Sequence, residues 1–229
     1  MNLKVPSWQY PGCYAESVTV PATALDRIPS ELAFAEAAPM GCAGVTTYNA
    51  LRNTKAMPGD RVAVLGVGGL GHLGLQFCRA MGFETIAINR GTGKADDARE
   101  LGAHHYIDST GGDVSEALRA LGGVSVVLAT AGNSTAMAET VGGLLPRGEL
   151  VAIGVTAEPL PVSPIQLITS GAGIKGQPSG TARDVEETMR FAVLSGVRAW
   201  IEQRPLAEAA AAYAAMEQGR PRYRIVLTM

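Results

Sequence analysis

Three glycines at fixed spacing are the strongest chemical signal in the 229-residue sequence. Gly66, Gly68 and Gly71 form the pattern G-x-G-x-x-G between the apolar run RVAVLG and a stretch with helical periodicity. In that context the first glycine permits a tight turn, the second lets the backbone approach a pyrophosphate, and the third allows the helix to pack closely on the strand. The helix that follows offers free N–H groups to the phosphates. The pattern therefore predicts a dinucleotide-binding loop, completed by Gly69 and Leu70; a glycine-rich turn without a ligand is the alternative.

The end of the next apolar run indicates which dinucleotide would bind. Sites for NAD usually place an Asp or Glu there, which accepts a hydrogen bond from the ribose 2′-OH. In this sequence Asn89 and Arg90 hold that place, and Lys94 follows four residues after Arg90. A neutral amide removes the repulsion against a 2′-phosphate, and a guanidinium can bind that phosphate in a bidentate manner. The pattern favours NADP(H) over NAD, unless Arg90 is simply a solvated loop residue.

Short apolar runs alternate with helical patterns from residue 61 onward, and these elements must position the loop. We expect strands over 61–66, 84–89, 104–108, 124–129, 149–154 and 172–176, and helices over 70–81, 93–102, 113–121, 134–145 and 182–196. Strands that are apolar throughout imply a parallel sheet covered on both faces. The expected fold class is therefore α/β, a doubly wound six-stranded parallel sheet of the Rossmann type. In such a sheet the fourth and fifth strands end at the cofactor crevice, which places Thr130, Ala131, Gly154 and Val155 there.

The segments before and after this alternating region follow other patterns. The stretch GCYAESVTVP alternates like a strand over residues 12–21, and two helices divided around residues 39–42 are expected after it. Near the end, an alanine-rich helix is predicted at 207–218, and RYRIVLTM predicts a terminal strand. The first 60 residues have too few strands to form an independent domain.

Composition narrows the classes of partner. Nineteen basic and 21 acidic residues give a formal charge of −2 without a basic block, which argues against a nucleic-acid or anionic-membrane surface. No apolar run reaches the roughly 18 residues of a membrane span, and no signal peptide is apparent. Cys13, Cys42 and Cys78 are too widely spaced for a zinc knuckle or a disulfide framework. A soluble, cytoplasmic protein with a small-molecule substrate is expected.

The stretch APMGCAGVTTYNALRNTKAMPGDRVAVLGVGGLGHLGLQ resembles the medium-chain dehydrogenase/reductase superfamily. It is most similar to the zinc-dependent alcohol dehydrogenases, including the NADP-using, cinnamyl-alcohol-dehydrogenase-like branch. The motifs GCYAESVTVPATALDRIP, ARELGAHHYIDS, SGTARDVEETMRFAVLSG and RYRIVLTM extend the resemblance from about residue 10 to the end. By this resemblance, residues 1–45 are a remnant of a GroES-like catalytic β domain, residues 46–199 are the dinucleotide-binding domain, and residues 200–229 are the returning C-terminal part of the catalytic domain. Most of the N-terminal GroES-like domain is lacking.

The resemblance also implies a metal position. Cys42 falls where the family has its last catalytic zinc ligand. A catalytic zinc needs three protein ligands, and one thiolate alone does not hold the ion. His72 follows the glycine loop, where the family has no ligand, and His104 and His105 lie at the start of the third expected strand, far from the expected substrate cleft. We therefore expect NADP(H) as the cofactor and doubt that zinc is bound.

Two further residues take roles from the resemblance: Thr46 packs near the nicotinamide, and Arg224 contacts the pyrophosphate. The resemblance implies an NADP(H)-dependent oxidoreductase that transfers hydride between an alcohol and an aldehyde or ketone. It also implies a homodimer, because the sixth strand often pairs across a two-fold axis in this family. Alternatives are a non-redox or cofactor-binding protein that retains the fold, and a fragment of a longer zinc dehydrogenase. No catalytic residue is assigned.

Overall fold

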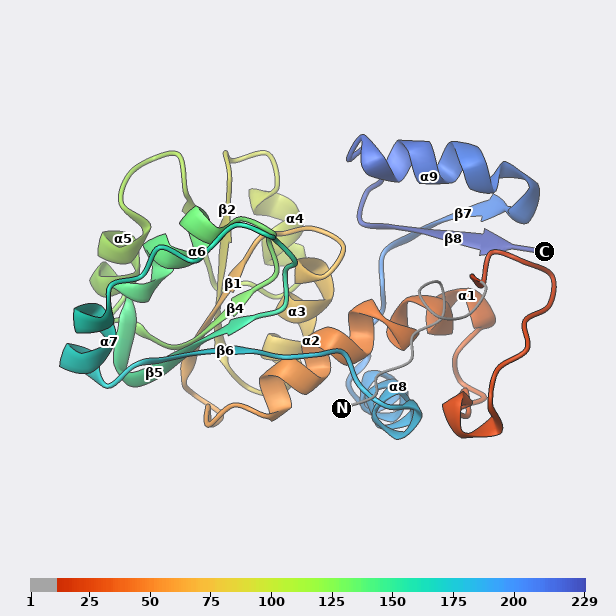
Figure 1. Cartoon of the computed structure of the whole chain (residues 1–229), viewed down its shortest axis with the longest axis horizontal. Coiled ribbons are helices and arrows are strands. Elements are labelled where there is room, and N and C mark those ends of the chain that lie inside the picture. Colours follow the sequence, from red (N-terminus) through yellow and green to blue (C-terminus); the bar gives the residue numbers. More distant parts are fainter. Residues whose placement is uncertain (1–11) are drawn as a thin grey trace.

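The computed structural model describes residues 12–229 and contains the expected parallel sheet (Figure 1). Its strand order is β3-β2-β1-β4-β5-β6, and every neighbouring pair is parallel. The strands are β1 (Arg61–Leu65), β2 (Glu84–Asn89), β3 (His105–Asp108), β4 (Val124–Ala129), β5 (Leu144–Ala152) and β6 (Gly173–Gly176). The order reverses between β1 and β4, as in a doubly wound dinucleotide-binding sheet. The predicted fold class is confirmed.

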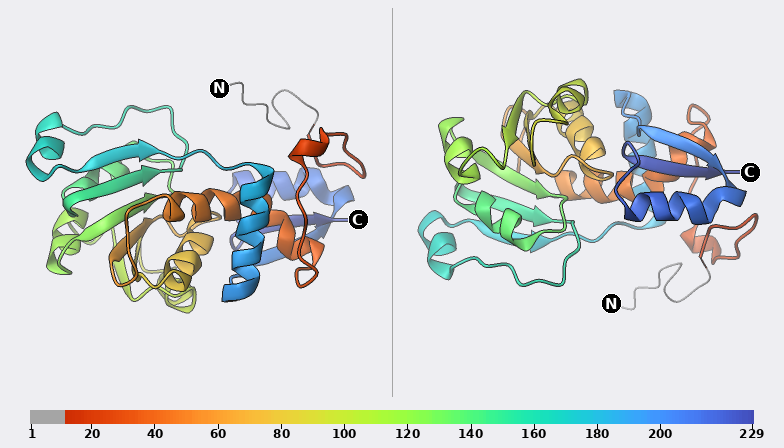
Figure 2. Two further views of the ribbon diagram at one scale, coloured as in Figure 1. Left: turned by 90° about the horizontal axis from the view of Figure 1, so that it is seen from below. Right: turned by 90° about the horizontal axis from the view of Figure 1, so that it is seen from above.

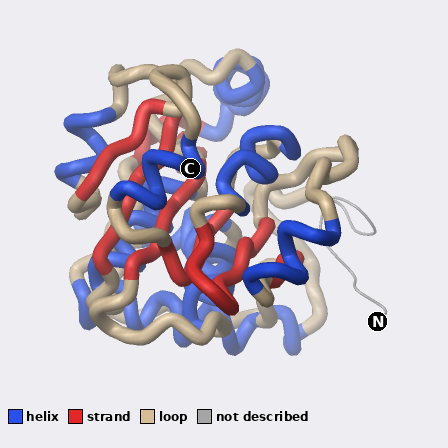
Figure 3. The backbone as a smooth tube through the Cα atoms, turned by 90° about the vertical axis from the view of Figure 1, so that its left-hand side faces the viewer, coloured by secondary structure: helices blue, strands red, loops and turns tan. Residues whose placement is uncertain are grey.

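Helices cover both faces of the sheet, and Figure 3 shows the strands between them. The helices of this region are α3 (Gly71–Ala80), α4 (Ala95–Glu100), α5 (Val114–Ala120), α6 (Ser134–Val141), α7 (Pro164–Ser170) and α8 (Ala182–Ser195). Alternate residues of β1 enter different cores. Val62 and Val64 belong to the core that includes Leu73 and Phe77 of α3. Ala63 and Leu65 belong to the core formed with α5 and α6.

A second group of elements lies beside the sheet and is joined to it by the helix α2 (Ala43–Arg52). Upstream of α2 lie η1 (Ala22–Ala24), α1 (Phe34–Ala37) and η2 (Ala38–Gly41). Downstream of α8, the strands β7 (Ile201–Pro205) and β8 (Arg224–Thr228) form a separate parallel pair. Figure 2 shows α9 (Ala209–Glu217) lying along this pair, and η3 (Leu206–Glu208) precedes α9. Ion pairs from Arg52 of α2 to Asp184 and Glu187 tie α2 to α8.

Three sequence-based predictions of secondary structure are wrong. No strand forms over residues 12–21, because the described chain offers that alternating segment no neighbouring strand to pair with. The helix expected to end at residue 145 ends at Val141, and β5 begins at Leu144 instead of residue 149. Here Gly143 passes so close to α5 that a Cβ on it would lie 2.5 Å from the Cβ of Leu118. The helix α7 and the strand β7 were not predicted. Residues 1–11 of the expected 1–45 segment lie outside the described residues.

Candidate functional site

The glycine loop connects β1 to α3 in a conformation that its glycines make possible. Gly66 has φ of 94°, and its N–H donates to the Ile88 carbonyl over 2.7 Å. A Cβ on Gly71 would collide with the carbonyl oxygen of Gly66, whereas one on Gly68 would meet no atom within 4 Å. The first and third glycines are therefore required by the turn itself. The space beside Gly68 is open, as the approach of a phosphate requires.

Three consecutive carbonyls of the loop are held by three basic side chains. The ammonium of Lys94 donates to the Val67 carbonyl over 2.7 Å, and Arg224 Nε donates to the Gly69 carbonyl over 2.9 Å. Between them, His72 Nδ1 lies 3.2 Å from the carbonyl oxygen of Gly68. We refer to Lys94, His72 and Arg224 as the carbonyl clamp. Because each peptide carbonyl is fixed on one side, the orientation of the loop N–H groups is fixed as well.

The loop N–H groups divide into two sets. The N–H of Gly66 is used within the sheet, and that of Val67 donates to Asn89 Oδ1 over 3.1 Å. Within residues 12–229, no acceptor faces the N–H groups of Gly68, Gly69 and Leu70. These three donors lie at the N-terminus of α3, where the helix dipole is positive. Three free N–H groups at such a position form an anion-binding site.

His72 is fully buried and must be neutral to fit its surroundings. The N–H of Trp200 donates to His72 Nε2 over 3.2 Å, so the ring proton lies on Nδ1, which donates to Gly68. Burial lowers the pKa of His72 to about 4, and the positive charges of Arg224 and Lys94 act in the same direction. The ring also stacks on Tyr223, with centroids 4.8 Å apart. The contact with Trp200 attaches the loop to the segment before β7.

The C-terminal strand supplies further contacts at this site. Tyr223 has φ of 83° and donates from its hydroxyl to Asp97 Oδ2 over 2.7 Å. Arg222 pairs with the same carboxylate over 2.8 Å, and the two contacts hold the pKa of Asp97 below its usual value. The ammonium of Lys94 lies 4.7 Å from the centroid of the Tyr223 ring. Burial lowers the pKa of Lys94 and also that of Arg224.

The end of β2 separates the residues that were expected to select the cofactor. The side-chain oxygen of Asn89 accepts a hydrogen bond from the Val67 N–H of the loop. The ammonium of Lys94 donates to the Val67 carbonyl. Arg90 is exposed and forms no ion pair with any residue of the described chain. The turn beyond it is fixed at Gly91, whose carbonyl accepts from Tyr106 over 2.6 Å. Among the described residues, Arg90 is therefore a cationic side chain beside the end of β2 that has no carboxylate partner.

The ends of β4 and β5 lie next to the loop, as expected for the crevice side of the sheet. Thr130 Oγ1 lies 2.9 Å from the carbonyl oxygens of both Leu65 and Gly66, and can donate to either. A Cβ on Gly154 would lie 2.5 Å from the carbonyl oxygen of Ala131, so the two strand ends are in close contact. Val155 follows and is 93% exposed. The structure therefore brings these four expected residues together at the carboxyl end of the parallel strands.

Thr46 and Cys42 lie at the start of α2. The hydroxyl of Thr46 donates to the Cys42 carbonyl over 2.7 Å and lies 3.1 Å from the hydroxyl oxygen of Ser179. The Cys42 side chain is exposed, and no group of three or more His, Cys, Asp or Glu residues within 12–229 could hold a metal ion. Because a catalytic zinc needs three protein ligands, the described residues do not form a complete zinc site.

Sequence analysis missed several residues that shape the site: Trp200, Tyr223, Asp97 and Ser179. None of them belongs to the glycine pattern, and each acts through contacts with segments distant in the sequence. His72 was singled out only for its position after the loop, which did not indicate its bond to Gly68 or its stacking on Tyr223. Its place one residue after the last glycine of the pattern is the one signal in the sequence that could have suggested this role.

Comparisons with known proteins agree with this geometry. Residues 69–193 match the family described as zinc-binding dehydrogenase. The chain is 38% identical over 218 residues to the alcohol dehydrogenase notN of Aspergillus sp., covering 95% of this chain and 64% of that protein. It is 36% identical to an alcohol dehydrogenase of Geobacillus stearothermophilus, covering 95% of this chain and 65% of the relative.

Solved structures show the same arrangement. The crystal structure of the alcohol dehydrogenase from the hyperthermophilic archaeon Aeropyrum pernix superposes with a TM-score of 0.88 at 28% identity, covering 100% of this chain and 68% of that one. The chain thus spans about two thirds of the length of these relatives. Among the described residues, no helix combines the length and apolar character needed to cross a membrane.

Proposed function

The chain belongs to the zinc-binding dehydrogenase family, and we propose that it acts as an NADP(H)-dependent oxidoreductase of the alcohol dehydrogenase type. The proposed reaction interconverts an alcohol and an aldehyde or ketone by hydride transfer. The observation that carries the proposal is the row of free N–H groups at Gly68, Gly69 and Leu70, oriented by the carbonyl clamp. Such a row is suited to a pyrophosphate.

The residues present fit a dinucleotide. The open space at Gly68 leaves room for a phosphate, and the three N–H groups would donate to its oxygens. The half-buried guanidinium of Arg224 adds positive charge beside Gly69. The crevice formed by Thr130, Ala131 and Gly154 lies where the nicotinamide half would extend. When bound, the nicotinamide ring donates or accepts the hydride.

The preference for NADP(H) is assigned to Arg90. Asn89 brings no negative charge to the end of β2, and its side-chain oxygen already accepts a hydrogen bond from the Val67 N–H. Arg90 is exposed beside it and is free to bind a 2′-phosphate through charge-assisted hydrogen bonds. Lys94 supports the same site indirectly, by holding the loop carbonyl.

The test is a titration of the chain with NADPH and NADH, each followed by nicotinamide fluorescence. Arg90→Ala is expected to weaken NADPH binding by roughly 1.5–3 kcal/mol, the scale of a charge-assisted contact, and to leave NADH binding nearly unchanged. Arg27→Ala is the matched control, because Arg27 is also exposed and forms no ion pair within residues 12–229. Equal weakening of both cofactors by Arg90→Ala would refute the assignment. Failure of the wild-type chain to bind either cofactor would refute the proposed function.

We propose that two copies pair through β6. This strand is the edge of the sheet, and the adjacent helix α7 exposes Ile165 and Ile168, at 60% and 73%. An unpaired strand edge tends to pair with another chain. Replacing Ile174 of β6 with Pro, which removes a backbone donor, should convert a dimer to a monomer in sedimentation analysis. A wild-type chain that sediments as a monomer would contradict this assembly.

A further inference from the structure

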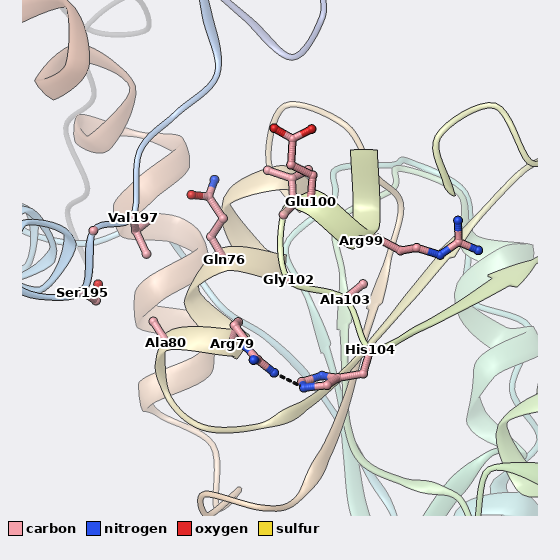
Figure 4. Close-up of a pocket in the computed structure, with 12 residues that line it drawn as sticks. Gln76, Arg79, Ala80, Arg99, Glu100, Gly102, Ala103, His104, Ser195 and Val197 are labelled. Carbon is pink, nitrogen blue, oxygen red and sulfur yellow. Dashed lines mark hydrogen bonds between the residues drawn. The ribbon is translucent and has the colours of Figure 1, made fainter. Parts of the chain in front are cut away.

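A pocket lies at the opposite end of the sheet from the glycine loop. This pocket, of about 530 Å³, lies between the C-terminal end of α3, the segment before β3 and the turn after α8 (Figure 4). The loop follows the carboxyl end of β1, whereas the pocket wall includes His104, which precedes β3. The pocket is lined by Gln76, Arg79, Ala80 and residues 99–104 and 195–197.

Two hydrogen-bond donors on exposed side chains meet in this pocket, and no protein acceptor among the described residues lies between them. The N–H of Thr85 donates to His104 Nδ1 over 2.9 Å, so Nδ1 carries the lone pair and the neutral ring carries its proton on Nε2. Arg79 Nη1 is in contact with that same Nε2, and Figure 4 shows the two side chains pointing toward one another. A guanidinium has no acceptor. The contact therefore brings together two N–H donors.

The carboxylate of Glu84, whose charge acts on His104, is paired with other residues. Glu84 pairs with Arg61 over 3.0 Å and with His105 over 2.9 Å. On the far wall, Figure 4 shows the Glu100 carboxylate and the Arg99 guanidinium directed away from His104. Arg99 pairs with Asp96 instead, over 2.7 Å. Across residues 12–229, Arg79 forms no ion pair with a protein carboxylate.

The position of Arg79 is set by packing along its aliphatic stem. Gly102 has φ of 104°, and a Cβ there would lie 2.8 Å from the Cβ of Arg79. The glycine therefore lets the arginine stem lie against the backbone and directs its guanidinium to His104. Burial and the charge of Arg79 lower the pKa of His104, so the ring is neutral near physiological pH and keeps its Nε2–H donor.

We propose that this pocket binds a small oxyanion, a phosphate or carboxylate group, through an oxygen that accepts from both Arg79 and His104 Nε2–H. An oxygen seated there replaces a contact between two donors by two hydrogen bonds, one of them charge-assisted. The site uses no residue of the dinucleotide site and is independent of the proposed function.

The experiment follows the imidazole resonances of His104 by NMR near neutral pH. Inorganic phosphate and sodium acetate are titrated separately, against sodium chloride at equal ionic strength. A saturable shift of the His104 signals is expected with phosphate, acetate or both, and the more effective probe identifies the group that is bound. Absence of a saturable shift with both probes would overturn the proposal.

Two variants test whether anion binding depends on Arg79 itself or only on the positive charge near the pocket. Arg79→Gln is expected to weaken the anion-induced shift roughly tenfold or more, the effect of losing a charge-assisted bond. Arg99→Gln is the matched control, because Arg99 lines the same pocket but pairs with Asp96, and it should retain the wild-type titration. Circular dichroism melting of each variant checks that the fold is retained. An unchanged titration in Arg79→Gln, or an equal loss in Arg99→Gln, would refute the assignment.

Discussion

Acidification should remove stability from this protein through the protonation of His72. The ring is fully buried, accepts a bond from the Trp200 N–H at Nε2 and lies near the positive charges of Lys94 and Arg224. Adding a proton would place two N–H groups against each other and a third cation in the carbonyl clamp. The folded protein therefore resists protonation, whereas an unfolded chain does not.

The magnitude follows from the two pKa values. In the fold the pKa of His72 is about 4, compared with 6.5 for an ordinary histidine. Because the folded value is lower, the contribution is complete above about pH 6.5 and is lost as pH falls toward about pH 4. One pKa unit corresponds to about 1.4 kcal/mol, so roughly 2.5 kcal/mol should be lost between about pH 7.5 and about pH 4.5.

The assay measures the free energy of unfolding by urea denaturation across this pH range, for the wild-type chain and for His72→Gln. The variant should be less stable near neutral pH, and the difference between the two proteins should shrink by about 2–3 kcal/mol as the pH falls. The control is His105→Gln, since His105 is partly exposed and paired with Glu84. A difference for His72→Gln that stays constant with pH would show that the ring is not held neutral in the fold.

Two further predictions concern the glycine pattern and Cys42. Gly71→Ala should lower the melting temperature, because its Cβ would collide with the Gly66 carbonyl. Gly68→Val should leave the melting temperature nearly unchanged, since no atom lies within 4 Å of its Cβ position, yet abolish dinucleotide binding; the reverse pattern would contradict the roles assigned to the two glycines. The purified chain should carry well below one zinc per molecule, because Cys42 belongs to no ligand group within the described residues. Stoichiometric zinc that disappears in Cys42→Ser, measured by atomic emission, would refute this expectation and direct the search for further ligands to His72, His104 and His105.

Local pattern was sufficient to predict most of the sheet, because a strand buried on both faces must be apolar along its whole length. The run RVAVLG became β1, and the final run containing Arg224 became β8. The same logic failed at residues 12–21, where alternation indicates a pleated surface but does not provide a partner strand. It also missed β7, whose sequence IEQRP has little apolar character and whose one partner strand among residues 12–229 is β8.

In the candidate site, too, the features set by neighbouring residues were predictable and those set by distant residues were not. The positions of Gly66, Gly68 and Gly71 follow from the turn, which depends on adjacent residues alone. The bond from Trp200 to His72 joins residues 128 positions apart, and the bond from Arg224 to Gly69 spans 155 positions. No local spacing encodes such contacts, because they depend on how the C-terminal segment returns to the sheet. Arg224 was predicted from the family resemblance, whereas Trp200 was not predicted at all.

This dependence on distant residues makes the C-terminal segment part of the candidate dinucleotide site. A glycine loop with free carbonyls could rotate its peptide planes, and its N–H groups would then have no fixed direction. Here Lys94 fixes the first carbonyl from the start of α4, His72 the second from α3, and Arg224 the third from β8. The sequence pattern supplies a loop that can bend, while the clamp decides which way its donors point. Loss of β8 should therefore weaken dinucleotide binding even though every residue of the glycine pattern is retained.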